Sequence, residues 1–132
     1  MTIEFILIWM IFMHIVDDYY LQGILAKMKQ RSWWEENAPQ DMYKNDYIVA
    51  LIMHSISWAF SIMLPLAIFM KFIIDILFIG LFIANVVIHF IVDDLKANKK
   101  KLNLIQDQTI HVAQILLTCL LIVSRLSLVV TS

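Results

Sequence analysis

One stretch of the sequence decides the fold class: residues 47–70, YIVALIMHSISWAFSIMLPLAIFM, contain no Asp, Glu, Lys or Arg. A helix needs about 20 apolar residues to cross the hydrocarbon core of a bilayer, and only helices and closed barrels satisfy their backbone there. Three further runs of similar length hold at most two charged residues each: residues 5–26, 72–92 and 108–124. None of the runs shows the strict alternation of barrel strands. The pattern predicts an all-α membrane protein.

The composition points the same way. Of the 132 residues, 61 % are hydrophobic and 16 % are charged, and the mean hydropathy is +0.79. Soluble domains carry about 25 % charged residues, so an ordinary soluble enzyme is excluded. The net charge of −1 gives no indication of nucleic-acid binding, and the lone Cys119 forms no disulfide framework. We expect a single integral membrane domain covering residues 1–132.

We expect four transmembrane helices that form a helical bundle, at about residues 3–27, 47–66, 70–97 and 104–127. Pro65 and Lys71 mark an expected tight turn between the second and third helices. The segment between the first and second helices mixes Trp33, Trp34 and Tyr43 with charged residues. This mixture is typical of a short amphipathic segment that lies in the interfacial layer of the membrane.

The basic residues predict the orientation. Eight of them lie in or beside the loops after the first and third expected helices, and two, Lys71 and Arg125, lie toward the other side. The positive-inside rule therefore predicts a multi-pass protein of the cell (inner or plasma) membrane. Loops 28–46 and 98–103 would be cytoplasmic and both termini extracytoplasmic. Membrane lipids are then the expected partners, nucleic acid is not, and a homo-oligomer is possible.

Each expected helix supplies one histidine, and the four histidines fall at similar depth. At a rise of about 1.5 Å per residue, they lie roughly 10 Å below the cytoplasmic surface. Three of them form i,i+4 pairs with an aspartate: His14 with Asp18, His89 with Asp93, and His111 with Asp107. Residues at this spacing share a helix face. A layer of imidazoles capped by a layer of carboxylates is expected.

Ionisable residues inside a membrane are costly and point to a function, and the cores of helix bundles can hold His/carboxylate metal sites. Such ligands favour a divalent transition metal, zinc first, with Mn, Fe or Ni as alternatives. The candidate metal ligands are His14, Asp18, His54, His89, Asp93, Asp107 and His111. Outer partners that would orient these ligands are Asp17, Gln22 and Gln108. The candidate catalytic residues are Asp18, Asp93 and Lys96, of which Lys96 would steady an anionic group such as a lipid phosphate.

These residues carry a resemblance to a known family. Its elements are His14-x3-Asp18-Tyr-x2-Gln22, His54 in the next apolar helix, His89-x3-Asp93-x2-Lys96 and Asp107-Gln108-x2-His111. They resemble the bacterial and phage membrane family called domain of unknown function 3307, in which the position of Tyr19 is usually Phe. The resemblance implies an integral membrane protein with the motif residues in its helices. It supplies no activity.

Three functions remain open. A metal-dependent membrane hydrolase acting on a lipid or other interfacial substrate is the leading interpretation. A small metal-ion or proton transporter is an alternative, because chains of Asp and His relay both, although polar residues mostly stop beyond His14. A non-catalytic scaffold is the third: His54 would then be an interhelical hydrogen-bond partner, Asp94 an interfacial residue paired with the lysines that follow it, and Asn85 a packing residue.

Overall fold

The computed structural model describes residues 2–130, with side chains as far as residue 127. These residues form α1 (Ile3–Val16), the π-helical turn η1 (Asp17–Leu21), α2 (Leu25–Met28), α3 (Arg31–Asn37), the 3-10 turn η2 (Asp41–Tyr43), α4 (Asp46–Phe69), α5 (Ile76–Ala97) and α6 (Leu104–Val130). No strand occurs among the described residues. The predicted all-α fold class is confirmed.

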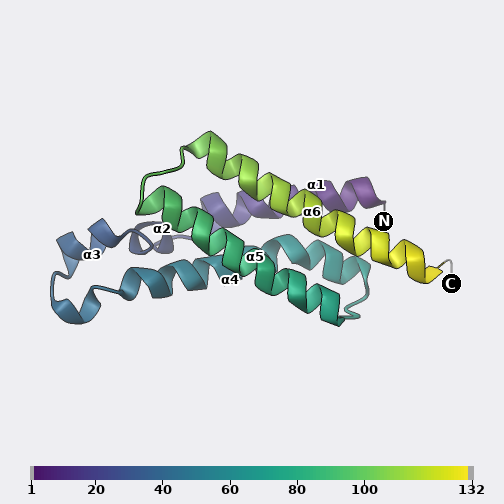
Figure 1. The fold of residues 1–132 in the computed structure, drawn as a ribbon, viewed down its shortest axis with the longest axis horizontal. Coiled ribbons are helices and arrows are strands. Elements are labelled where there is room, and N and C mark those ends of the chain that lie inside the picture. The colour runs from purple at the N-terminus through teal and green to yellow at the C-terminus, as the bar shows by residue number, and fades with distance from the viewer. Residues whose placement is uncertain (1, 131–132) are drawn as a thin grey trace.

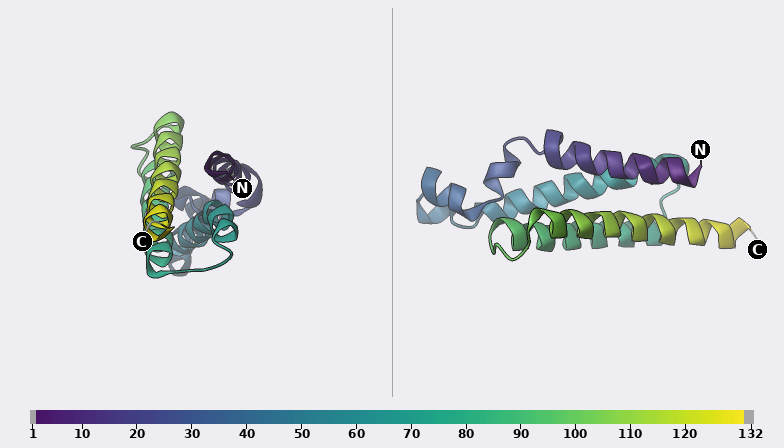
Figure 2. Two further views of the ribbon diagram at one scale, coloured as in Figure 1. Left: turned by 90° about the vertical axis from the view of Figure 1, so that its right-hand side faces the viewer. Right: turned by 90° about the horizontal axis from the view of Figure 1, so that it is seen from above.

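The long helices lie side by side along one axis (Figure 1). The N-terminus, the C-terminus and the α4–α5 turn lie at one end of the molecule, whereas α2, α3 and the α5–α6 loop lie at the other (Figures 1 and 2). The two basic loops and the two chain ends therefore occupy opposite ends of the bundle.

Among the described residues, three helical segments are long and apolar enough to cross a membrane: Asp41–Phe69, Ile76–Ala97 and Leu104–Ser127. Their outward faces carry large apolar side chains; for example, Phe60 is 59 % exposed and Leu120 is 63 % exposed. Lipid would cover such faces, whereas soluble proteins rarely expose apolar surface of this extent to water. α1 has 14 residues and a similar outward face, with Ile8 and Phe12 exposed.

The first helix is shorter than expected. α1 ends at Val16 and passes into η1. The helical course of the chain then ends at Gly23, whose φ is +50°. Glycine adopts this left-handed conformation without the steric cost that a Cβ brings. α2 is consequently a separate helix at the end of the bundle.

The α4–α5 turn lies further along the chain than Pro65 suggested. Pro65 is buried inside α4, which continues to Phe69. A proline inside a helix removes one backbone hydrogen bond; Pro65 and the neighbouring Leu66 are both buried. The turn is made by Lys71 and Phe72, which both have positive φ.

α5 begins only after this turn, because a side chain caps it there. The Asp75 carboxylate accepts a hydrogen bond from the backbone N–H of Phe78 at 2.8 Å, as an N-cap does. Asp75 also forms an ion pair with Arg125, whose Nη1 atom lies 2.7 Å from Asp75 Oδ2. Asp75 thus caps α5 and pairs with α6 at the end of the bundle where α1 begins.

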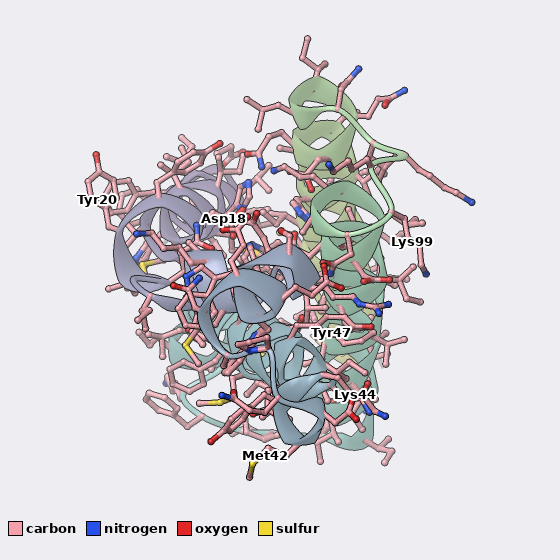
Figure 3. The ribbon with its side chains drawn as sticks, turned by 90° about the vertical axis from the view of Figure 1, so that its left-hand side faces the viewer. Asp18, Tyr20, Met42, Lys44, Tyr47 and Lys99 are labelled. Atoms are coloured by element: carbon pink, nitrogen blue, oxygen red, sulfur yellow. The ribbon has the colours of Figure 1, made fainter. Side chains whose placement is uncertain are left out.

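The interior of the bundle is divided along its axis. Toward the chain termini the interior is mainly apolar and includes Ile6, Met10, Ile62 and Leu66, with the polar pair of Asn85 and Thr118 buried among them. The half nearer the loops holds the buried histidines and aspartates. In a view from the loop end, Asp18 lies between the helices, whereas Tyr20, Lys44 and Lys99 point outward (Figure 3).

Candidate metal centre

The structure brings the four histidines together in the interior. His54, His89 and His111 have no exposed surface, and His14 is 2 % exposed. The ring centroids of His54 and His89 lie 5.0 Å apart, those of His89 and His111 4.3 Å, and those of His14 and His111 5.6 Å. One imidazole from each of α1, α4, α5 and α6 therefore reaches one layer.

Ligand atoms converge around the Nε2 atom of His54. The Nε2 atom of His89 lies 3.2 Å from it, and Asp18 Oδ1 and Asp93 Oδ2 each lie 3.4 Å from it. Zinc binds nitrogen and oxygen ligands at about 2.0–2.2 Å, so two ligands of one tetrahedral ion lie about 3.3–3.6 Å apart. The observed separations are those of atoms that can share one ion.

A second set of atoms surrounds His111. Its Nε2 atom lies 3.4 Å from Asp107 Oδ1, one helical turn earlier on α6, and 3.6 Å from Asp93 Oδ1 on α5. Asp93 therefore lies between His111 on one side and His54 on the other.

Several of these atoms are buried without a hydrogen-bond partner among the described residues. They are Asp18 Oδ1, Asp107 Oδ1, His111 Nε2, and the Nδ1 atoms of His54 and His89, together with Asp17 Oδ2 and Gln22 Oε1 further out. A buried polar atom without a partner costs free energy, and a buried charge without one costs more. A metal cation would supply the missing partner for the ligand atoms that face one another.

In the part of the chain that the structure describes, two groups of three residues can hold a metal ion. They are Asp18, His54 and His89, and His89, Asp93 and His111; within each group the ligand atoms all lie within 4.8 Å of one another. Both combine imidazole with carboxylate, a donor set that suits Zn, Mn, Fe or Ni. A buried His/Asp cluster that can bind metal is thus present.

His14 belongs to neither group, because both its ring nitrogens bind protein atoms. Trp58 donates its indole N–H to His14 Nδ1 at 2.8 Å, so this nitrogen is the acceptor and Nε2 carries the proton. His14 Nε2 then donates to Gln108 Oε1 at 3.1 Å. His14 Nδ1 is also 3.3 Å from Asp18 Oδ2, which places His14 behind the carboxylate rather than beside His54.

Asp17 lies behind His54. Its Oδ1 atom accepts hydrogen bonds from Ser57 at 2.7 Å and Ser61 at 3.0 Å, and its Oδ2 atom lies 3.6 Å from His54 Nδ1. Metal-binding histidines are commonly oriented by a carboxylate on the nitrogen that does not bind metal. Asp17 and Asp18 are consecutive yet both buried, and they begin the π-helical turn η1, a type of turn that is frequent at functional sites.

Gln22 and Gln108 differ in position. The Gln22 side-chain amide donates to the backbone carbonyl of Asp18, on its own helical turn. Gln108 contacts His14 and also donates to Asp107 Oδ2 at 2.9 Å. Gln108 therefore lies against the cluster, and Gln22 supports the turn that carries Asp18.

Two lysines contact the cluster from the loop side. Lys96 Nζ lies 2.6 Å from Asp107 Oδ2, and Lys29 Nζ lies 2.6 Å from Asp93 Oδ2. Asn98 at the end of α5 holds the Lys29 segment, since its amide donates to the Lys29 carbonyl at 3.1 Å and its Oδ1 accepts from the Arg31 N–H at 2.7 Å. With neutral imidazoles, four buried aspartates and two lysines leave a net charge of −2, which a divalent cation balances.

Asp94 does not join the cluster. It forms an ion pair with Lys99 at 2.9 Å and accepts a hydrogen bond from the Asn98 side-chain amide at 3.0 Å. The hydrogen bond to Asp94 raises the pKa of Lys99 above its ordinary value. Of the pairing expected between Asp94 and the lysines after it, the ion pair with Lys99 is confirmed.

Two residues of the cluster escaped the sequence analysis. Trp58 is fully buried and stacks on His89, with ring centroids 4.2 Å apart and planes at 19°. Its position four residues after His54 on one helix face was the available signal. Lys29 gave no signal, because nothing in the sequence shows that its segment returns to α5.

Comparison with protein-family models, curated proteins and solved structures finds no match for this chain.

Proposed function

We propose that the protein is a metal-dependent membrane hydrolase that acts on a lipid or another interfacial substrate at the cytoplasmic face. The observation that carries this proposal is the convergence of Asp18, His89 and Asp93 atoms within 3.2–3.4 Å of His54 Nε2 in a buried site. A metal bound there would supply an activated water and a Lewis acid.

The protein's own residues have separate roles in the proposed reaction. Hydrolysis adds water across the scissile bond: the water oxygen bonds to the reacting centre, and a proton passes to the leaving oxygen. Asp18 would hold the ion through Oδ1, which faces His54, and its second oxygen, Oδ2, would accept the proton of the water. Lys96 is 36 % exposed along its side chain on the loop side, where it can pair with an anionic substrate group.

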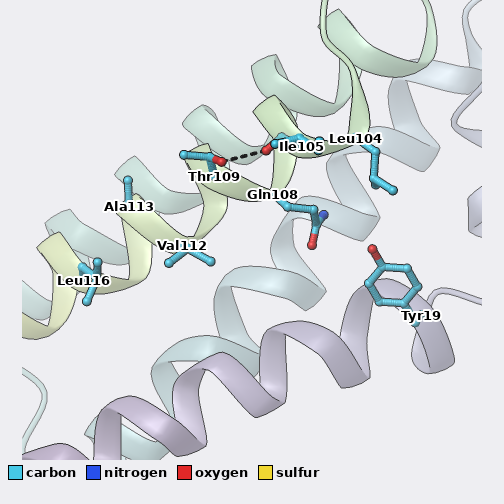
Figure 4. A pocket seen from close by; sticks show the side chains of 8 residues that line it. All are labelled: Tyr19, Leu104, Ile105, Gln108, Thr109, Val112, Ala113 and Leu116. Carbon is cyan, nitrogen blue, oxygen red and sulfur yellow. Dashed lines mark hydrogen bonds between the residues drawn. The ribbon is translucent and has the colours of Figure 1, made fainter.

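An apolar groove supports a lipid as the substrate. The groove has a volume of about 600 Å³ and runs between η1 and α6, lined by Tyr19, Leu104, Ile105, Gln108, Thr109, Val112, Ala113 and Leu116. Gln108 and Tyr19 point toward one another across it (Figure 4). Because Gln108 also contacts His14 and Asp107, an acyl chain in the groove would bring its head group to the cluster.

We propose four membrane crossings, with α1 and η1 as the first. Both chain ends lie at one end of the bundle (Figure 1), and a chain with both ends on one side crosses an even number of times. The eight basic residues at the opposite end favour the cytoplasm for that end, and the inner or plasma membrane as the location. We also propose that the chain is related to domain of unknown function 3307, on the His/Asp motifs that carry the resemblance.

Transport is the second candidate, and a deeper set of polar residues bears on it. Asn85 donates to Thr118 at 2.9 Å and accepts from Gln114 at 3.2 Å, one turn beyond the histidines. These three side chains bind one another, and the buried residues beyond them are apolar, such as Ile122 and Cys119. The polar layer thus ends within the bundle, which favours a closed site over a path.

The test is hydrolysis of phospholipid vesicles by the purified protein, with metal content measured on the same sample. We expect His89→Gln to lose both metal and hydrolysis. Asp94→Asn, which removes a carboxylate one residue from Asp93 but outside the cluster, should keep both. A metal-loaded protein that transports the ion and hydrolyses no lipid would favour the transporter, and a metal-free, inactive protein would favour the scaffold.

A further inference from the structure

Asp18 and Asp93 each have two oxygens that face different imidazoles, but Trp58 already occupies the nitrogen of His14 that Asp18 Oδ2 faces. No such donor occupies the imidazole nitrogens that Asp93 faces among the described residues. The Oδ2 atom of Asp93 lies 3.4 Å from His54 Nε2 and 3.7 Å from His89 Nε2. Its Oδ1 atom lies 3.6 Å from His111 Nε2. A carboxylate between two sets of imidazoles is placed as a bridge between two metal ions.

We propose that the centre binds two divalent ions bridged by the Asp93 carboxylate. The inference rests on the proposed metal function and adds the number of ions. The ligands of the first ion are Asp18 Oδ1, His54 Nε2, His89 Nε2 and Asp93 Oδ2; those of the second are Asp93 Oδ1, His111 Nε2 and Asp107 Oδ1.

A single ion leaves part of the cluster unexplained. The two candidate groups share only His89; the first adds Asp18 and His54, and the second adds Asp93 and His111. His111 Nε2 and Asp107 Oδ1 face one another at 3.4 Å, and their residues are at most 1 % exposed. Within the described part of the chain, neither atom has a hydrogen-bond partner. An ion at Asp18, His54 and His89 does not relieve the cost of burying them.

The Lys29 contact does not block the bridge. Each carboxylate oxygen has two lone pairs, so Asp93 Oδ2 can accept from Lys29 and still face the imidazoles. Lys96 occupies Asp107 Oδ2 and leaves Oδ1 directed at His111. Lys29 and Lys96 come from the segment after η1 and from the last turn of α5, so both belong to the loop end of the cluster.

The charge of a two-ion centre indicates its substrate class. Two divalent ions change the net charge of the cluster from −2 to +2, which an anionic substrate would offset. Two-metal sites hold the attacking and leaving oxygens of in-line displacement at phosphorus. The inference therefore narrows the proposed substrate to a phosphate ester, in which water adds to phosphorus, the bond to the leaving oxygen breaks, and that oxygen takes up a proton.

The experiment is Mn²⁺ loading of the full chain purified in detergent, with bound manganese counted per chain and its spin coupling recorded by electron paramagnetic resonance. We expect two ions per wild-type chain and an exchange-coupled spectrum. His111→Gln and Asp107→Asn should each retain one ion with the spectrum of isolated Mn²⁺. Asp93→Asn should lose the coupling, and the control Asp94→Asn should keep two coupled ions.

Burial of the single Cys119 thiol is measured on every variant, so that unfolded samples are recognised. One ion per wild-type chain, retained in His111→Gln, would overturn the two-ion centre and leave the proposed hydrolase with a single ion. Two ions without spin coupling would overturn the bridge. No bound ion at all would overturn both proposals.

Discussion

Removing metal should destabilise the protein, because an ion at this site would join helices that are far apart in the sequence. The ligand atoms come from η1, α4, α5 and α6, so separated helices have no comparable site. An ion bound only by the folded state stabilises it by about 2.7 kcal/mol at a free concentration of 100 times Kd, and by about 4.1 kcal/mol at 1,000 times Kd. Each further tenfold rise should add about 1.4 kcal/mol.

The chain contains its own reporter for this assay. Its single cysteine, Cys119, is 4 % exposed in the apolar half of the bundle, so a thiol-reactive fluorophore reports unfolding. We expect a chelator to lower the unfolding midpoint of the wild type, and added Zn²⁺ to restore it. All four histidines of the sequence lie in the cluster, which removes exposed histidine as a competing site.

His54→Gln is the matched variant, and its midpoint should not respond to chelator. Asp94→Asn should respond as the wild type does. Equal midpoints for wild type with chelator and with saturating Zn²⁺ would refute the reasoning, because a buried ion that joins four segments cannot be lost without cost.

Three further predictions concern protons, a buried indole and topology. Metal occupancy should fall on mild acidification, since the ligands bind as neutral imidazole and ionised carboxylate; equal occupancy at neutral and mildly acidic pH, measured after dialysis, would point to a packing network. Trp58→Phe should lower the free energy of unfolding by about 1–3 kcal/mol, because the phenyl ring can stack on His89 but leaves the buried His14 Nδ1 without its donor. Trp9, which is half-buried, gives the control variant Trp9→Phe, and an equal loss of unfolding free energy in both variants would contradict this role of Trp58. In cells whose protein lacks the native cysteine, a membrane-impermeant thiol reagent should label Lys71→Cys and not Lys100→Cys, and the reverse pattern would invert the topology.

The gathering of the four histidines in one layer could be predicted from the sequence, because their positions along the helices depend on helical rise and spacing. The i,i+4 pairs of His89 with Asp93 and of Asp107 with His111 do face one another. Helical periodicity is a local property, so these pairs need no knowledge of how the helices pack.

The assignment of each ring nitrogen could not be predicted, since it depends on contacts between helices. His14 has the same spacing to its aspartate as His89 has, yet Trp58 of α4 occupies its Nδ1. Likewise, regular helical geometry predicts that one of Asp17 and Asp18 points away from the core, whereas the π-helical turn buries both. Lys29 reaches Asp93 only because Gly23 breaks the helix and turns the chain back over the end of α5.

X-ray absorption at the metal edge of the protein, purified from cells grown with a full set of transition metals, tests the central claim most directly. The account predicts bound metal with a first shell of nitrogen and oxygen and the outer-shell scattering of imidazole, lost in His89→Gln and kept in Asp94→Asn. Folded wild-type protein that contains no metal, or metal that persists in His89→Gln, would contradict it.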